Sequence, residues 1–274
     1  MFSGRDLSIE KIVWKVVLMG AVLSSLLPAA DTGPSYTAAG IVHAATQTVQ
    51  ALAPNTIATI YGTNLAFATH AISTGDIRGG ALPTSLEGVG VVVNSITASL
   101  FFVSPTQINF LVPYELLPGT VTVYVARQNL AGPLVKIQLN SAAPGMFIWN
   151  GNMAIAAHLN GSVISREAPA VAGEIIVVYA TGLGRVAPDT ITGKIASGAA
   201  TIVARSQLQI LLDGVACPAP NVLYAGLAPG FAGLYQINLK LPSSLPLNPE
   251  IRLVIGSASS PSLIQLATVS SPGA

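Results

Sequence analysis

Charge is the first thing this sequence lacks. Asp, Glu, Lys and Arg make up 8% of its 274 residues, against about a quarter of an ordinary soluble domain. With 12 basic and 11 acidic side chains, no large basic surface can form, so electrostatic binding of nucleic acid is excluded as the main function. A hydrophobic content of 51% also excludes a disordered chain. Ser, Thr, Asn and Gln must therefore cover most of the surface.

Cysteine is nearly absent as well, because Cys217 stands alone. A single cysteine cannot form an internal disulfide, so the fold must depend on its hydrophobic core. No histidine or basic residue lies near Cys217 in the sequence, and we interpret it as a small, half-buried hydrophobic residue rather than a nucleophile. His43, His70 and His158 are isolated from one another, which is not the spacing of metal ligands.

The common catalytic and cofactor signatures are missing too. There is no Gly-x-Ser-x-Gly elbow, no His-Glu-x-x-His pair and no Asp-x-Asp calcium loop. Gly182-Leu183-Gly184 lacks the third glycine of a dinucleotide-binding site. Gly193-Lys194 is followed by Ile195, whereas a phosphate-binding loop has Ser or Thr in that position. We therefore expect a non-enzyme with no catalytic, cofactor-binding or metal-ligating residues and no cofactor.

The N-terminus has the composition of an export signal. Arg5, Lys11 and Lys15 precede an apolar stretch, 16–27, which small residues close at Pro28-Ala29-Ala30. This pattern predicts a signal peptide over 1–30. The alternative is a retained anchor, but the apolar run is shorter than the roughly 20 residues that span a bilayer. Removal of 1–30 takes away three basic and two acidic side chains and leaves nine of each, so we expect a neutral mature chain, without a membrane span, in the periplasm, outside the cell or on its surface.

The rest of the sequence predicts an all-β protein. Short runs rich in Val, Ile, Thr and Tyr alternate with turn residues, and no sustained helical periodicity occurs. The expected strands form two sets. The first covers 56–61, 88–93, 97–103, 107–112, 120–127 and 134–139, and the second covers 174–180, 207–212, 215–223, 233–241, 250–255 and 262–269.

The two sets are copies of each other. Residues 57–65 match 175–183, residues 93–98 match 212–217, and residues 107–113 match 236–242, at offsets of 118, 119 and 129. A repeat of this length fits a tandem pair of β-sandwiches rather than a solenoid. We predict a flexible leader or a strand leading into the fold at 31–52, a first immunoglobulin-like sandwich at 53–141, a connecting β segment at 142–172 and a second sandwich at 173–270.

Two repeated motifs have a readable physical content. In Tyr-(Gly/Ala)-Thr-x-Leu a strand ends in a sharp turn, where the Thr can bond back to the local backbone. In Gln-Ile-Asn the two amides share one face of the sheet. Gln107 and Asn109, with their counterparts Gln236 and Asn238, could form a ligand-binding ladder. We prefer the interpretation that they satisfy backbone groups of a neighbouring loop.

Longer motifs extend the pattern over about residues 50–270. They stand, in order, at Ala53-Pro54, Tyr61-Gly62-Thr63-Asn64-Leu65, Leu82-Pro83-Thr84-Ser85-Leu86, Phe102-Val103-Ser104-Pro105-Thr106-Gln107-Ile108-Asn109, Ala143-Pro144-Gly145-Met146-Phe147, Tyr179-Ala180-Thr181-Gly182-Leu183-Gly184, Leu227-Ala228-Pro229-Gly230-Phe231 and Gly233-Leu234-Tyr235-Gln236-Ile237-Asn238.

These motifs resemble the "Solibacter-type" C-terminal domain family of exported acidobacterial proteins, with immunoglobulin-like repeats of the IPT/TIG type. The resemblance implies tandem β-sandwiches and export, and it brings no catalytic residues with it. Members usually follow propellers or other repeats in larger secreted proteins, whereas here the module makes up nearly all of the expected mature chain.

Three functions follow from this sequence. We favour an exported, non-catalytic module for adhesion or for binding a neutral cell-surface carbohydrate or protein. Its ligand would then contact loops that differ between the copies, 66–81 and 185–206. One alternative is a structural spacer without a ligand. A less favoured alternative is an outer-membrane β-barrel, which 19 prolines and unequal loop lengths argue against.

Overall fold

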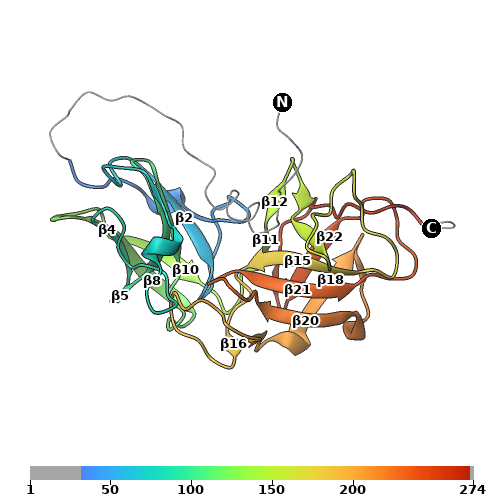
Figure 1. The fold of residues 1–274 in the computed structure, drawn as a ribbon. Coiled ribbons are helices and arrows are strands. Elements are labelled where there is room, and N and C mark those ends of the chain that lie inside the picture. The colour runs from blue at the N-terminus through green and yellow to red at the C-terminus, as the bar shows by residue number, and fades with distance from the viewer. Residues whose placement is uncertain (1–31, 272–274) are drawn as a thin grey trace.

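A computed structural model describes residues 32–271, and the predicted signal peptide lies outside this range. The described chain forms strands joined by turns and four short 3₁₀ helices, with no α-helix. Every pair of named strands is antiparallel (Figure 1). The predicted all-β class of two tandem immunoglobulin-like sandwiches is therefore confirmed.

Strands of the N-terminal half build the first sandwich, around one hydrophobic core. One sheet has the order β1-β2-β7-β6-β3, and the other has the order β10-β8-β4-β5, with β9 beside β8. Their bounds are β1 Ile41–His43, β2 Ile57–Tyr61, β3 His70–Ala71, β4 Val89–Val93, β5 Ile96–Thr97, β6 Ser99–Val103, β7 Gln107–Leu111, β8 Gly119–Arg127, β9 Leu130–Ala131 and β10 Val135–Leu139.

The C-terminal half builds a second sandwich. Its larger sheet runs β11-β15-β21-β20-β17-β16 with β14 also on β15, its smaller sheet runs β19-β18-β22-β23, and β12 and β13 form a separate hairpin. The bounds are β11 Gly145–Met146, β12 Ile148–Trp149, β13 Met153–Ala154, β14 Ala156–His158, β15 Ile175–Thr181, β16 Val186–Ala187, β17 Thr201–Ile202, β18 Leu208–Leu212, β19 Val215–Ala216, β20 Val222–Leu227, β21 Tyr235–Lys240, β22 Ile251–Ile255 and β23 Ala258–Ser259.

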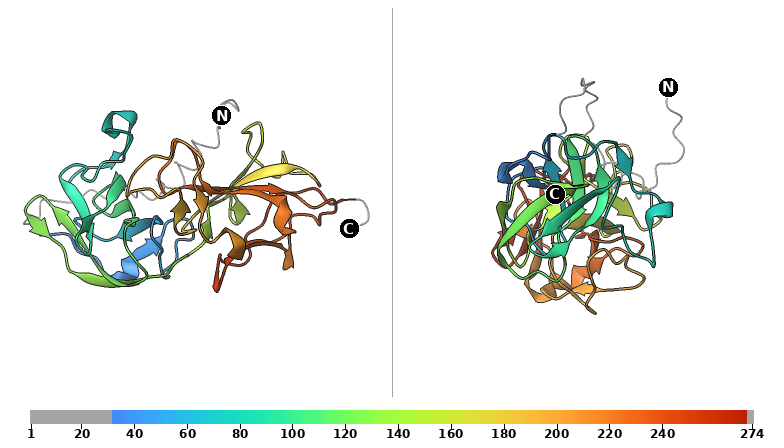
Figure 2. Two further views of the ribbon diagram at one scale, coloured as in Figure 1. Left: turned by 90° about the horizontal axis from the view of Figure 1, so that it is seen from below. Right: turned by 90° about the vertical axis from the view of Figure 1, so that its left-hand side faces the viewer.

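The topology repeats as the sequence does. The order β2-β7-β6 in the first half corresponds to β15-β21-β20 in the second, and the group β5-β4-β8-β9 corresponds to β19-β18-β22-β23. The two halves lie end to end in an elongated molecule, blue to green and yellow to red in Figures 1 and 2.

Three of the expected strands differ in the structure. The segment 97–103 is divided into β5 and β6, and 215–223 is divided by the 3₁₀ helix η4 (Ala219–Asn221) into β19 and β20. The segment 262–269 was wrong as a strand. Its backbone bonds to three different parts of the chain, near Asn152, Ala170 and Pro249, so no continuous ladder forms although its apolar residues are buried.

The two sandwiches share a third hydrophobic cluster at their junction. It joins Ile57, Phe101 and Leu111 of the first half to Phe147 and Leu234 of the second. The second half reaches this place with the β20–β21 loop, residues 228–234, where the first half has only the short β6–β7 turn, residues 104–106. Strands β6 and β7 are consequently buried along their whole length, whereas β4 and β8 alternate between buried and partly exposed residues as strands with one covered face do.

The polar side chains of the two repeated motifs have defined partners, and Thr181 differs from the expectation. Thr181 Oγ1 accepts a hydrogen bond from Ile57 N (3.0 Å) and donates one to Gly233 O (2.8 Å), so it links the two halves rather than its local turn. Gln107 Nε2 donates to Asn109 Oδ1 (2.9 Å), and Gln236 Nε2 to Asn238 Oδ1 (3.3 Å). Each glutamine thus bonds the asparagine on its own strand.

Candidate functional site

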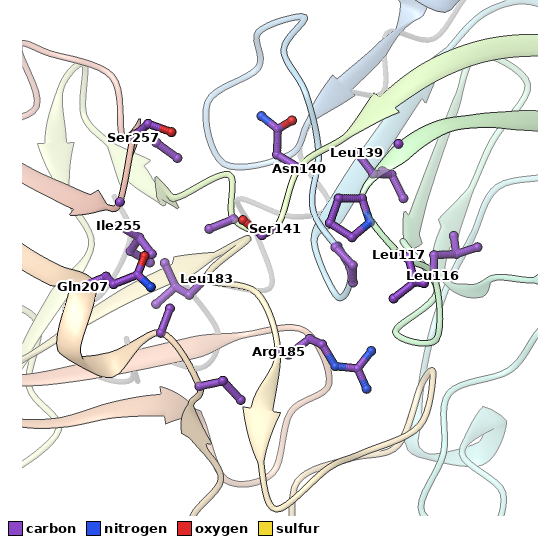
Figure 3. A pocket seen from close by; sticks show the side chains of 18 of the residues that line it. Leu116, Leu117, Leu139, Asn140, Ser141, Leu183, Arg185, Gln207, Ile255 and Ser257 are labelled. Carbon is purple, nitrogen blue, oxygen red and sulfur yellow. The ribbon is translucent and has the colours of Figure 1, made fainter.

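A cleft of about 760 Å³ lies where the two halves meet. The first half contributes residues 116–118 of the β7–β8 loop, Gly119 at the start of β8, and the end of β10 with the following residues 140–142. The second half contributes η3 (Arg205–Gln207) and the β22–β23 turn (Figure 3). The lining residues are Pro54, Leu116, Leu117, Pro118, Gly119, Gln138, Leu139, Asn140, Ser141, Ala142, Leu183, Arg185, Val203, Ala204, Gln207, Ile255, Gly256, Ser257 and Ala258.

Most polar side chains of this cleft are neutral. Gln138, Asn140 and Ser141 come from one wall, and Gln207 and Ser257 come from the other. All five residues are exposed, and amides and hydroxyls both donate and accept hydrogen bonds. The cleft can therefore bond the hydroxyl or amide groups of an uncharged ligand from two sides.

Aliphatic side chains stand on both sides of the same cleft. Leu117 of the first half is 70% exposed, and Val203 of the second half is 65% exposed. Apolar surface combined with a few polar groups is the usual composition of a ligand site. A ligand with an apolar face would bury both side chains.

Arg185 is the only ionisable residue in the described lining. Its guanidinium is already paired with a carboxylate and an aromatic ring. Its guanidinium lies over the Tyr114 ring, 4.6 Å from the centroid, and Nη2 is 3.2 Å from Asp189 Oδ2. The Tyr114 hydroxyl donates to Asp189 Oδ1 (2.6 Å), and burial, with a smaller contribution from this bond, raises the pKa of Tyr114. The pair of opposite charges leaves the cleft close to neutral.

The described lining of the cleft lacks the side chains that usually act as general acids or bases. Its lining contains no Asp, Glu, His, Cys or Lys, and general acid–base or covalent catalysis needs such a group near the substrate. The lining residues that are present provide hydrogen bonds and apolar contact to a ligand.

The titratable residues singled out in the sequence lie elsewhere, and each has a structural partner. His43 is completely buried at the junction, His70 lies between Asp76 and Glu87, and His158 bonds Glu174. Burial raises the pKa of the Cys217 thiol, which disfavours the reactive thiolate. In residues 32–271 no group of three or more His, Cys, Asp or Glu side chains is placed to hold a metal ion.

The two loops expected to carry binding, 66–81 and 185–206, contact each other. Ala81 pairs with Lys194 as a β-bridge, Leu82 N donates to Gly193 O (3.0 Å), and Ile195 N donates to Gly80 O (2.9 Å). The second loop is also held on the first half by Thr192, whose Oγ1 accepts from Tyr114 N (2.7 Å). Parts of both loops therefore join the halves, and only Arg185, Val203 and Ala204 of the second line the cleft, with Gln207 following it.

Sequence reasoning did not find the cleft. Its walls come from segments without a motif, such as 138–142 and 255–258, which become neighbours only when the sandwiches dock. The signals in the sequence were the predicted binding loop 185–206, which contributes three lining residues, and Leu117, a leucine between Pro113 and Pro118.

Comparison with known proteins identifies no family. No family model matches the chain, and no curated protein matches it. Among solved structures, the plexin A4 extracellular region aligns with 86% of this chain at 12% identity and a TM-score of 0.29. SGBP-B of the Bacteroides ovatus mixed-linkage glucan utilization locus, in complex with a mixed-linkage heptasaccharide, aligns with 89% of this chain at 12% identity and a TM-score of 0.34. The chain spans 18% and 46% of those two proteins.

These likenesses are too distant to carry an argument about ligand or location. Along residues 32–271, no helix has the length and apolar character needed to cross a bilayer.

Proposed function

We propose that this protein is an exported, non-catalytic binding module, which holds a neutral extracellular carbohydrate or protein segment in the cleft between its two sandwiches. The observation that carries the proposal is the lining of the cleft. It combines amide and hydroxyl side chains on both walls with the exposed Leu117 and Val203, and contains a single ionisable residue.

Neutrality of the whole molecule supports the same class of ligand. The chain carries a formal net charge of +1, so long-range steering of a charged partner is weak. Hydrogen bonding and apolar contact must then provide the binding free energy. Export, the signal peptide over 1–30 and membership of the Solibacter-type family are parts of this proposal that rest on the sequence.

Substitution at the cleft tests the proposal. Val203→Asp places a charge at the exposed rim, and Val215→Asp is the matched control, because Val215 is 71% exposed in the same half and outside the cleft. On arrays of neutral glycans and of purified cell-surface proteins, we expect the Val203→Asp protein to lose at least tenfold in affinity for whatever the wild type binds. The Val215→Asp protein should bind as the wild type does, and both should melt at the wild-type temperature.

The competing function is a spacer without a ligand. A wild-type protein that binds neither array would favour the spacer and overturn the binding proposal. Binding that survives both substitutions unchanged would overturn the assignment to the cleft.

A further inference from the structure

An exposed aromatic ring is fixed on the first sandwich, away from the cleft. Phe67 is 53% exposed, and the Arg127 guanidinium lies over one face of its ring, with Cζ 4.0 Å from the centroid. Because one face lies on the guanidinium while more than half of the residue is exposed, the opposite face is open to solvent. Phe67 follows the C-terminal end of β2 in the sequence, and the first residue of that strand, Ile57, is the one that bonds Thr181.

The guanidinium that supports this ring is itself immobilised. Arg127 is only 2% exposed, and it donates from Nη1 to Asn64 O (2.7 Å) and from Nη2 to Thr32 O (3.0 Å). A cation over a ring face attracts it. The ring is therefore held in one orientation before any ligand arrives, which lowers the entropy lost on binding.

Hydrogen-bonding residues stand on the turns next to Arg127, the residue that supports the ring. The pairing of Val89 with Arg127 and the bond from Gln128 N to Gly88 O (2.8 Å) bring the turn containing Glu87 beside the end of β8. Glu87, Gln128 and Asn64 are all exposed. We call Phe67, Asn64, Glu87 and Gln128 the Phe67 patch.

The charges at the patch are compensated locally. Glu87 Oε1 is 2.8 Å from His70 Nδ1, and His70 Nε2 is 3.2 Å from Asp76 Oδ2. Two carboxylates on the two ring nitrogens favour the doubly protonated imidazolium, since a neutral ring has only one N–H. The pKa of His70 is accordingly raised, mainly by the bond to Glu87. An exposed carboxylate, two amides and an open ring then face solvent with little net charge.

We propose that the Phe67 patch binds a neutral saccharide, with the C–H face of one sugar ring against Phe67 and its hydroxyls bonded to Asn64, Glu87 and Gln128. The apolar face of a pyranose matches an open aromatic ring, and its hydroxyls match carboxylate and amide partners at the ring's edge. A polypeptide would need a groove or a strand edge for its backbone, and the patch consists of turns around one ring. The proposal extends the proposed function to a second, separate site.

The test compares variants of the ring in the full chain. Phe67→Ala and Phe67→Leu remove the ring, Phe67→Trp keeps it, and Leu134→Ala is the control, since Leu134 is 70% exposed on the same half. The probes are soluble neutral polysaccharides, namely mixed-linkage glucan, xylan and galactomannan, measured by affinity electrophoresis and calorimetry. We expect the Ala and Leu variants to lose at least tenfold in affinity for the polysaccharide that the wild type binds, while Phe67→Trp and Leu134→Ala retain it.

The outcomes separate this site from the cleft. Polysaccharide binding that survives Phe67→Ala but fails in Val203→Asp would overturn the Phe67 patch and leave the proposed function standing. A wild type that binds proteins but none of the polysaccharides would also overturn the saccharide assignment alone. Equal losses in Phe67→Leu and Phe67→Trp would show that ring stacking is not the interaction, whereas a wild type that binds nothing would overturn both proposals.

Discussion

His43 shows how one residue can report the docking of the two halves. Its side chain is completely buried, Nδ1 accepts a hydrogen bond from Ala45 N (3.2 Å), and Nε2 lies 3.0 Å from Ala143 O, to which it must donate. These partners fix a neutral ring with its proton on Nε2. Gly145 and Gly182 pack so closely on the ring that a Cβ on either would lie 2.2 Å and 3.1 Å from its atoms. Burial lowers the pKa of His43 to about 4.

This pKa predicts that the protein loses stability in mild acid. The ordinary pKa of the unfolded chain is higher, about 6.5, so the unfolded state takes up the proton first as the pH falls. The stability that the neutral His43 provides is fully present above a pH of about 6.5 and is lost progressively as the pH falls towards 4. At pH 4.5 the loss in the free energy of unfolding should be about 2–3 kcal/mol. Urea unfolding at pH 7 and pH 4.5 measures it. His43→Gln should be less stable at pH 7 and should lack this component of the pH dependence, and an identical pH dependence in wild type and variant would contradict the assignment.

The sequence reveals this role only in part. His43 falls in the segment 31–52, predicted as a flexible leader or a strand leading into the fold, and it ends the buried strand β1. Its partners Ala143 and Gly182 lie about 100 and 140 residues away. The alternation of apolar residues identifies what is buried, while the partner of a buried polar atom depends on how the sandwiches dock. The contact of Phe67 with Arg127 was equally unpredictable, because nothing in the sequence around Phe67 indicates that Arg127 lies beneath the ring.

At the scale of elements, the turn after β15 makes one of the close backbone contacts of the junction. Gly182 has φ +79° and its N-terminal neighbour Thr181 bonds both halves. A Cβ on Gly182 would lie 2.1 Å from Ala143 O, a backbone atom of the segment that leads from one sandwich into the next. A side chain here would have to displace that segment.

Two glycines with the same φ separate the effect of packing from that of backbone strain. Gly214 also has φ +79°, and no atom lies within 4 Å of the place its Cβ would take. Gly214→Ala should therefore cost only the strain of a left-handed residue, about 1 kcal/mol. Gly182→Ala should cost about 2–3 kcal/mol more, measured as the free energy of unfolding in urea. Equal losses in the two variants would mean that the turn after β15 is free to move.

Strand positions were predictable where one face is buried, and less so elsewhere. The alternating strands β4, β8, β18 and β22 begin within one residue of their expected starts, because a period of two is legible in the sequence. The segment 262–269 has the same apolar content but divides its backbone bonds among several neighbours. Composition predicts burial there, and only the tertiary structure determines the partners.

On the scale of the whole molecule, the duplication predicted two sandwiches but not their asymmetry. Gln107 and Asn109 are buried at 1% and 0% exposure, whereas the equivalent Gln236 and Asn238 are half-buried. The first pair therefore cannot serve as a ligand ladder. Equivalent sequence positions have different environments because the second half covers a sheet of the first, and the cleft arises from the same docking.

The shared core predicts that the two halves unfold together. Phe147 is fully buried in the cluster that joins them. We expect one calorimetric transition for the wild type, with equal calorimetric and van't Hoff enthalpies. Phe147→Ala should cost about 3–5 kcal/mol, whereas Phe67→Ala, at an exposed position, should leave the transition in place. Two resolved transitions in the wild type, only one of them sensitive to Phe147→Ala, would show independent sandwiches.

The unequal loops at the junction also limit how such modules can multiply. The second sandwich inserts its residues 228–234 against Ile57 and Leu111 of the first, with Gly233 directly on Leu111, but the first sandwich has only the short turn 104–106 in the corresponding place. A third copy placed before the first would find no such insertion reaching back to it. The junction is therefore made by the C-terminal sandwich reaching back to the sandwich before it. A longer array could grow only by adding sandwiches at the C-terminal side, each with its own long loop equivalent to β20–β21.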